Sequence, residues 1–177
     1  MESDRELIEL AHKGDSDAFE ALYYRYRDWV YRLAWRFTGN RADALDALQE
    51  TFIYLLGKFP GFELTASMTT FLYPVVRHIC FTIRSKRNRF TSEEQVLSEL
   101  PARKSGESEY YKSELAAVLI VLPDEQREVL LMRFVDDMGL KEIAAALDIP
   151  LGTVKSRLHN ALRALRDDRR TREYFLE

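Results

Sequence analysis

Apolar residues recur at helical spacing along most of the chain, and this pattern predicts helices rather than strands. The first predicted helix begins at Ser3, where Ser3-Asp4-Arg5-Glu6 has the sequence of a capping box, and it stops at Gly14. A second helix follows Asp15 and ends at Gly39-Asn40. We interpret its long apolar stripe mainly as core packing, with these members: Phe19, Leu22, Tyr23, Tyr26, Val30, Leu33, Ala34 and Phe37.

Two more helices are predicted before residue 90. The third covers residues 41–56, and its expected buried side consists of Leu45, Leu48, Phe52 and Leu55, whereas its other flank carries Asp43, Asp46, Gln49 and Glu50. The segment Lys58-Phe59-Pro60-Gly61-Phe62 then breaks the pattern. The fourth helix reaches towards Asn88. Because proline disrupts a helix interior, we expect Pro74 to make this helix start late or kink.

The apolar periodicity is lost between residues 91 and 113, where acidic and small polar residues dominate. Beyond this segment, Leu115–Leu122 predicts one helix, and Pro123-Asp124-Glu125 has the proline and acids typical of a first helical turn. No run of alternating β-branched residues appears. The sequence therefore predicts an all-α fold class, with two small helical domains at residues 1–90 and 114–177 joined by a flexible linker at residues 91–113.

The second domain contains the pattern of a helix-turn-helix. A short stripe, Leu140 to Leu147, is followed by a bend at Pro150 and by a longer stripe that ends at Leu165. The opposite face of the longer helix is rich in hydrogen-bond donors: Thr153, Lys155, Ser156, Arg157, Asn160 and Arg163. Such side chains contact phosphates and base edges when a helix lies in the major groove. An ordinary helical hairpin with a solvated basic face is the alternative, but the capping, turn and charge patterns together favour DNA binding.

The net charge of −3 lacks the excess of basic residues that is usual in a nucleic-acid-binding protein, but the charges are unevenly distributed. No acidic residue occurs from Leu64 to Ser92, and that segment contains five cations: Arg77, Arg84, Lys86, Arg87 and Arg89. Two interpretations remain open. The segment forms a local surface that collects phosphates, or it is a solvated helix end whose cations complement the helix dipole.

Other features bear on location and on catalysis. A single cysteine, Cys80, excludes a disulfide within the chain and favours a reducing compartment. The acidic start is not a signal peptide, and the longest apolar run is too short to cross a bilayer, so we expect a soluble, cytoplasmic protein. His12, His78 and His159 lie on separate predicted helices, and no glycine-rich phosphate loop occurs. We therefore expect no enzyme activity, no metal site and no cofactor.

Two blocks together resemble a known family. These are DALQETFIYLL at Asp46–Leu56 and, at the other end, LPDEQREVLLMRF with EIAAALDIPLGTVKSRL. They are similar to bacterial RNA polymerase sigma factors of the extracytoplasmic-function (ECF) type, and the resemblance covers nearly the whole chain. It implies a region 2-like domain and a region 4-like domain, with core RNA polymerase and promoter DNA as partners. An anti-sigma factor is a further partner that the resemblance alone suggests.

The resemblance also implies roles for individual residues. Asp46, Gln49 and Glu50, beside Leu45, correspond to the polymerase-binding helix. The loop Phe59–Ser67 corresponds to the segment that holds a flipped base of the minus-ten element, where Phe62 supplies either a stacking ring or a hydrophobic anchor. The other minus-ten residues are Phe71, Arg77, His78, Arg84 and Arg87, and the minus-thirty-five residues are Thr153, Lys155, Ser156, Arg157 and Asn160.

The sequence departs from the family pattern at a few of these positions. Phe71 stands where tryptophan is usual, His78 where asparagine is usual and Asn160 where arginine is common. Two other functions are compatible with the residues alone. One is a helix-turn-helix regulator that binds DNA without polymerase, and the other is an adaptor whose first domain binds only protein.

Overall fold

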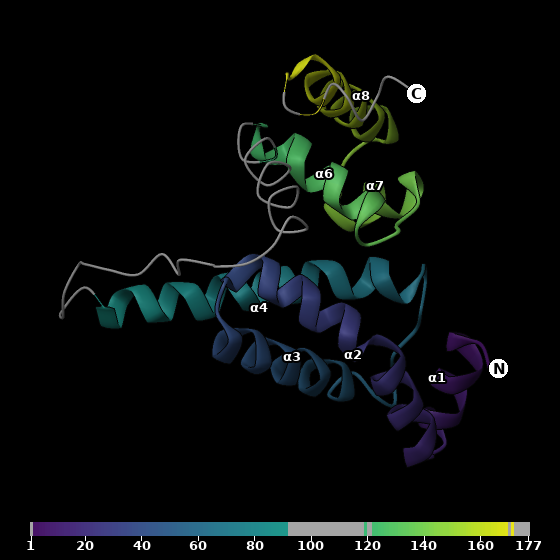
Figure 1. The fold of residues 1–177 in the computed structure, drawn as a ribbon. Coiled ribbons are helices and arrows are strands. Elements are labelled where there is room, and N and C mark those ends of the chain that lie inside the picture. Colours follow the sequence, from purple (N-terminus) through teal and green to yellow (C-terminus); the bar gives the residue numbers. More distant parts are fainter. Residues whose placement is uncertain (1, 92–118, 120–121, 170, 172–177) are drawn as a thin grey trace. The chain divides into compact units, whose positions relative to one another are not determined.

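The computed structural model describes residues 2–91, 119, 122–169 and 171, and the chain divides into the units Met1–Val96 and Leu97–Glu177. All regular secondary structure of the described residues is helical (Figure 1), which confirms the all-α class. The first unit contains α1 (Asp4–His12), α2 (Ser16–Thr38), α3 (Arg41–Leu56) and α4 (Met68–Thr91), and the second contains α6 (Asp124–Phe134), α7 (Leu140–Leu147) and α8 (Leu151–Asp167). Nearly all of the predicted linker and of the helix Leu115–Leu122 lies outside the described residues.

Local capping explains where the first helices begin and end. The Glu6 carboxylate accepts a hydrogen bond from the Ser3 N–H at 2.6 Å, and Ser3 Oγ accepts one from the Glu6 N–H at 3.3 Å. These bonds favour the ionised carboxylate and lower the pKa of Glu6. Asp15 Oδ1 caps α2 by accepting hydrogen bonds from the Asp17 and Ala18 N–H groups, and Gly39, at φ +64°, ends that helix in the left-handed conformation that glycine tolerates best. The predicted ends of α1 and α2 are confirmed.

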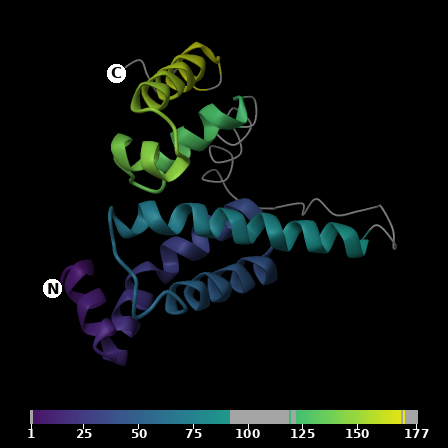
Figure 2. The same ribbon diagram turned by 180° about the vertical axis from the view of Figure 1, so that it is seen from behind.

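The core of the first unit lies where α2 packs against α3 and α4. Helix α2 contacts α1, α3 and α4, and α4 also packs along α3, as Figures 1 and 2 show from opposite sides. All three long helices contribute fully buried side chains, among them Leu22, Val30, Leu33, Ala34, Ala44, Ala47, Leu72, Tyr73, Val76 and Cys80. Burial raises the pKa of the Cys80 thiol to about 11, so this cysteine stays protonated at neutral pH.

One sequence-based expectation for this unit is wrong, and so is one of the two alternatives given for Pro74. Leu45 was expected in the core, but 45% of it is exposed, because small residues such as Ala44 and Ala47 bring the neighbouring side of α3 against the core. A late start of α4 at Pro74 was also considered. The helix instead begins at Met68, where Ser67 Oγ accepts a hydrogen bond from the Thr70 N–H at 3.2 Å, and it continues through an exposed Pro74.

The second unit is a helix-turn-helix in which α8 packs on both α6 and α7. Helix α7 ends at Asp148, whose φ of +53° turns the chain, and the Ile149 N–H donates to the Ala144 carbonyl at 3.0 Å. Pro150 then occupies the N-cap position of α8 without a side-chain hydrogen bond. Because Val154, Ala161 and Leu165 are buried, the remaining sides of α8 carry its polar residues. The predicted motif is confirmed.

Candidate polymerase and DNA interfaces

The predicted polymerase-binding residues lie together on the outer side of α3. Asp46, Gln49 and Glu50 are exposed, and Leu45 lies beside them. Leu45 and Gln49 also line a groove of about 440 Å³ between α2 and α3, whose other lining residues are Phe19, Tyr23, Leu48, Phe52, Ile53 and Leu56. This candidate docking face is therefore partly apolar. Sequence reasoning missed the groove because it assigned Leu45 and Leu48 to the core.

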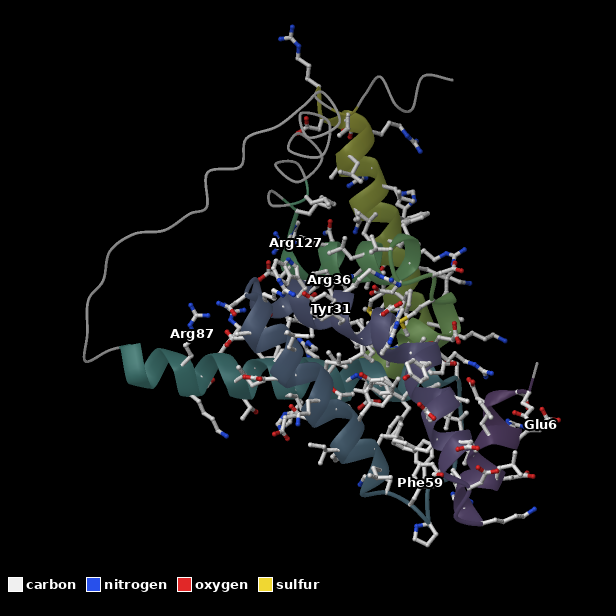
Figure 3. All side chains as sticks on the ribbon, turned by 60° about the horizontal axis from the view of Figure 1, so that its bottom comes forward. Glu6, Tyr31, Arg36, Phe59, Arg87 and Arg127 are labelled. Carbon is white, nitrogen blue, oxygen red and sulfur yellow. The ribbon has the colours of Figure 1, made fainter. Side chains whose placement is uncertain are left out.

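The exposed side of α4 carries the predicted DNA-binding cations, and these have contacts within the unit. Arg84 donates to the carbonyl oxygen of Phe37 at 3.1 Å. Arg87, labelled in Figure 3, forms an ion pair with Asp43 of α3 at 2.8 Å, and about half of its side chain is exposed. The Asp43 side chain is only 15% accessible, so the pair is partly buried, and a phosphate that binds this guanidinium has to share it with the Asp43 carboxylate or replace that carboxylate. His78 is also exposed on this helix.

The loop Phe59–Ser67 is anchored by aromatic contacts. Only 6% of Phe62 is exposed, and its ring centroid lies 4.7 Å from that of Phe71 and 5.7 Å from that of Phe59, which Figure 3 labels. The half-buried Phe71 also stacks on Tyr54, with 6.5 Å between centroids. In this conformation Phe62 packs as a hydrophobic anchor, and its role as a ring that stacks on a base stays a prediction.

The predicted minus-thirty-five residues share the outer side of α8 but differ in exposure. Lys155 and Ser156 are exposed, whereas Thr153, Arg157 and Asn160 are half-buried. Arg157 forms an ion pair with Glu125 of α6 at 2.6 Å, and 22% of the Arg157 side chain is accessible. This member of the predicted minus-thirty-five set thus already has a carboxylate partner. The helical pattern of α8 could not show this, since the partner comes from another helix.

Within the described part of the chain, no three His, Cys, Asp or Glu side chains are grouped closely enough to hold a metal ion. Among its helices, none combines the length and the apolar character that a membrane span requires.

Comparison with known proteins identifies the family. Residues 22–90 match the family described as Sigma-70 region 2, and residues 118–167 match Sigma-70, region 4. The chain is 30% identical over 174 residues to the ECF RNA polymerase sigma factor SigW of Bacillus subtilis (strain 168), and the alignment covers 90% of this chain and 92% of SigW. The chain therefore belongs to the ECF sigma factor family of RNA polymerase.

Solved structures share the fold. CnrH, in complex with the cytosolic domain of CnrY, matches with a TM-score of 0.68 at 20% identity, covering 92% of this chain and 94% of that one. The sigma factor RpoE, in complex with the anti-sigma factor NepR from Bartonella quintana, matches with a TM-score of 0.61 at 21% identity, covering 84% of this chain and 94% of that one. As a member of its family, the present protein binds RNA polymerase and promoter DNA, directs promoter-specific initiation of transcription and is not an enzyme.

Proposed function

We propose that the two units divide the work of initiation. Residues 1–90 dock on core polymerase through α3 and open the minus-ten element through α4, residues 91–113 are the linker, and residues 114–177 read the minus-thirty-five element through α8. The observation that carries this proposal is the segregation of charge within the first unit: α3 presents acids beside an apolar groove, whereas α4 lies in a segment without acidic residues.

Two further assignments complete the proposal. We place the protein in the cytoplasm, where sigma factors act. An anti-sigma factor is a proposed partner, because the sigma factor RpoE, which has the same fold, was solved in complex with one. The test of the whole proposal is transcription in vitro with core polymerase and promoters selected from a random library. Promoter-dependent initiation supports it, whereas specific DNA binding without initiation would indicate the polymerase-independent regulator.

The α3 face fits a protein partner for physical reasons. Leu45, Ile53 and Leu56 are large apolar side chains left exposed around the groove, and their burial under a partner is favourable. Asp46 and Glu50 lie exposed beside them. Charges at the rim of an apolar patch set the orientation and the association rate of a partner.

Reversing the charge of Asp46 and Glu50 together to lysine is expected to weaken core polymerase binding by about tenfold or more. Both side chains are exposed, so the helix content measured by circular dichroism should stay unchanged. The affinity is measured by titrating core polymerase into the labelled full chain. The matched control reverses Glu9 and Glu20, two exposed acids on α1 and α2, and keeps the parent affinity. Equal binding by the test and parent chains would remove α3 from the interface.

The exposed cations of α4 are proposed to hold phosphates of opened DNA, with His78 on the same exposed surface. Replacing Arg77, Arg84 and Arg87 by alanine should lower the slope of log affinity against log salt by about three, one unit for each phosphate contact. Permanganate footprints of the melted region should weaken more than initial promoter binding. The control replaces the exposed Arg5, Lys13 and Arg27. Footprints as strong as those of the parent would make α4 a merely solvated basic helix.

A further inference from the structure

We propose that His12, the last residue of α1, is a positioning residue for the loop Phe59–Ser67, and that α1 thereby takes part in promoter opening. The imidazole packs against the ring of Phe59 and fixes the start of the loop. Helix α1 precedes residue 22, where the match to Sigma-70 region 2 begins, and the family resemblance implies no role for it. The inference rests on the proposed function in one respect, namely that the first unit opens the minus-ten element with this loop at the flipped base.

The ring of Phe59 lies just after the end of α3, and rings from three segments surround it. Its centroid lies 5.1 Å from that of His12 on α1, 5.8 Å from that of Phe19 on α2 and 5.7 Å from that of Phe62 in the loop. The pairs with His12 and Phe19 are edge-to-face, an arrangement that aromatic rings prefer. Figures 1 and 2 show the segment between α3 and α4 passing beside the turn between α1 and α2. Phe59 is therefore the contact through which the first two helices hold the loop.

His12 is suited to this contact by its ring rather than by its Nε2 atom. Within the described part of the chain, His12 Nε2 is buried and has no hydrogen-bond partner. A buried polar atom without a partner is unfavourable, so the packing of the ring has to offset that cost. The edge-to-face contact with Phe59 provides such packing. A ring of similar size without polar atoms should therefore support the loop equally well.

Helix α1 is a fixed support because its first turn is attached to α2. The Asp4 carboxylate accepts a hydrogen bond from the Arg25 guanidinium at 2.6 Å and another from the Tyr26 hydroxyl. Arg25 also donates to the carbonyl oxygen of Glu2 at 2.8 Å. The ion pair is partly buried, since 22% of the Asp4 side chain and 28% of the Arg25 side chain are accessible. The helix is thus held at one end by Asp4 and presents His12 to the loop at the other.

The turn that follows α1 fixes the place of the imidazole. The Gly14 N–H donates to the Ala11 carbonyl oxygen at 3.1 Å, and Gly14 has a φ of +88°, which glycine tolerates best. Helix α2 begins at Ser16, directly after this turn. Because so short a connection joins the two helices, His12 cannot move away from Phe59 without disturbing the turn.

The position of Phe59 affects the exposed part of the loop. Phe62 packs against Phe59 on one side and against Phe71 of α4 on the other, at 5.7 and 4.7 Å between centroids. Glu63 and Thr65 follow in the loop and are exposed. Groups that contact a ligand have to be held in one arrangement by the residues that support them. Loss of the His12 ring should therefore allow the exposed loop residues to take more positions relative to α4.

The first test is amide hydrogen exchange in the full chain, without polymerase or DNA. His12→Ala and His12→Gln should each speed the exchange of the Phe59 and Gly61 amides, which are hydrogen-bonded in the turn after α3, by about tenfold. His12→Phe should keep the parent rates. Lys13→Ala, at the neighbouring exposed position, is the matched control and should keep them too. Parent exchange rates in His12→Ala would overturn the inference.

The second test is the base preference of the holoenzyme at the flipped position of a promoter selected from a random library. Permanganate footprints on the four single-base variants of that position measure it. The preference should fall about fivefold or more in His12→Ala and return in His12→Phe, while the affinity for core polymerase stays unchanged. Val30→Ala, in the core of the unit, is the control for lost stability. It lowers the fraction of folded protein but should leave the preference unchanged.

Replacing the exposed Glu63 and Thr65 together by alanine separates this inference from the proposed role of the loop. If that change alters the base preference and His12→Ala does not, the loop holds the base but His12 does not position it, and the inference is wrong. If neither change alters the preference, the loop does not meet the base, and the role proposed for the loop fails together with the inference.

Discussion

Replacing Phe62 with alanine is expected to destabilise the first unit by about 3–5 kcal/mol. The ring is almost completely buried and lies between Phe59 and Phe71, so its removal leaves a cavity at the base of the loop Phe59–Ser67. Phe62→Leu preserves most of the apolar volume and should cost under about 1.5 kcal/mol. Urea unfolding of the full chain, followed by circular dichroism, measures the transition of this unit in each variant.

Phe81, which is 47% exposed, provides the control, because its replacement by alanine removes less buried surface than that of Phe62 and should lower the folding free energy by less. A Phe62→Ala chain as stable as the parent but unable to form open complexes would contradict the anchor assignment. Such a result would restore Phe62 as a base-contacting ring and would require the loop to rearrange on DNA.

Helix positions could be predicted from the sequence because the signals that set them are local. The Ser3 capping box, the cap at Asp15 and the glycine at position 39 each act within a few residues, and each lies where the structure begins or ends a helix. The helix-turn-helix was predictable for the same reason, since Pro150 and the two apolar stripes are close in sequence. Where a helix runs is largely a property of its own segment.

The orientation of α3 and the partners of the cations depend on non-local packing. Leu45 and Leu48 dominate the apolar stripe of α3, but alanines at positions 44 and 47 form the buried contact, because small side chains allow neighbouring helices to approach closely. The ion pairs Arg87–Asp43 and Arg157–Glu125 each join two different helices. The periodicity of a single helix does not show which residue of another helix it contacts. The partners of the charged residues could therefore not be predicted, although the helices themselves could.

The pair Arg157–Glu125 leads to the second large expected effect. Arg157→Ala should weaken binding to the upstream promoter element by about 1–3 kcal/mol and relax the preference at one base pair, because a guanidinium engages guanine in a bidentate manner. Glu125→Gln removes the competing charge and should retain both the affinity and the preference. Lys155 is exposed on the same helix. If it contacts a phosphate, Lys155→Ala should lower the affinity for all DNA sequences by the same factor. Titrations of the full chain across single-base variants of the selected element measure these effects.

Glu125→Gln also separates base reading from positioning. The Arg157 guanidinium lies 2.6 Å from the Glu125 carboxylate and is only 22% accessible, so the ion pair also joins α8 to α6. If Arg157→Ala and Glu125→Gln reduce affinity equally for every sequence, Arg157 positions the helix and does not read a base. If only Arg157→Ala relaxes the preference at one base pair, the Arg157 guanidinium reads a base. DNA binding must then displace this guanidinium from the Glu125 carboxylate. Unchanged affinity and preference in Arg157→Ala would exclude both roles and leave the reading to Thr153, Ser156 and Asn160.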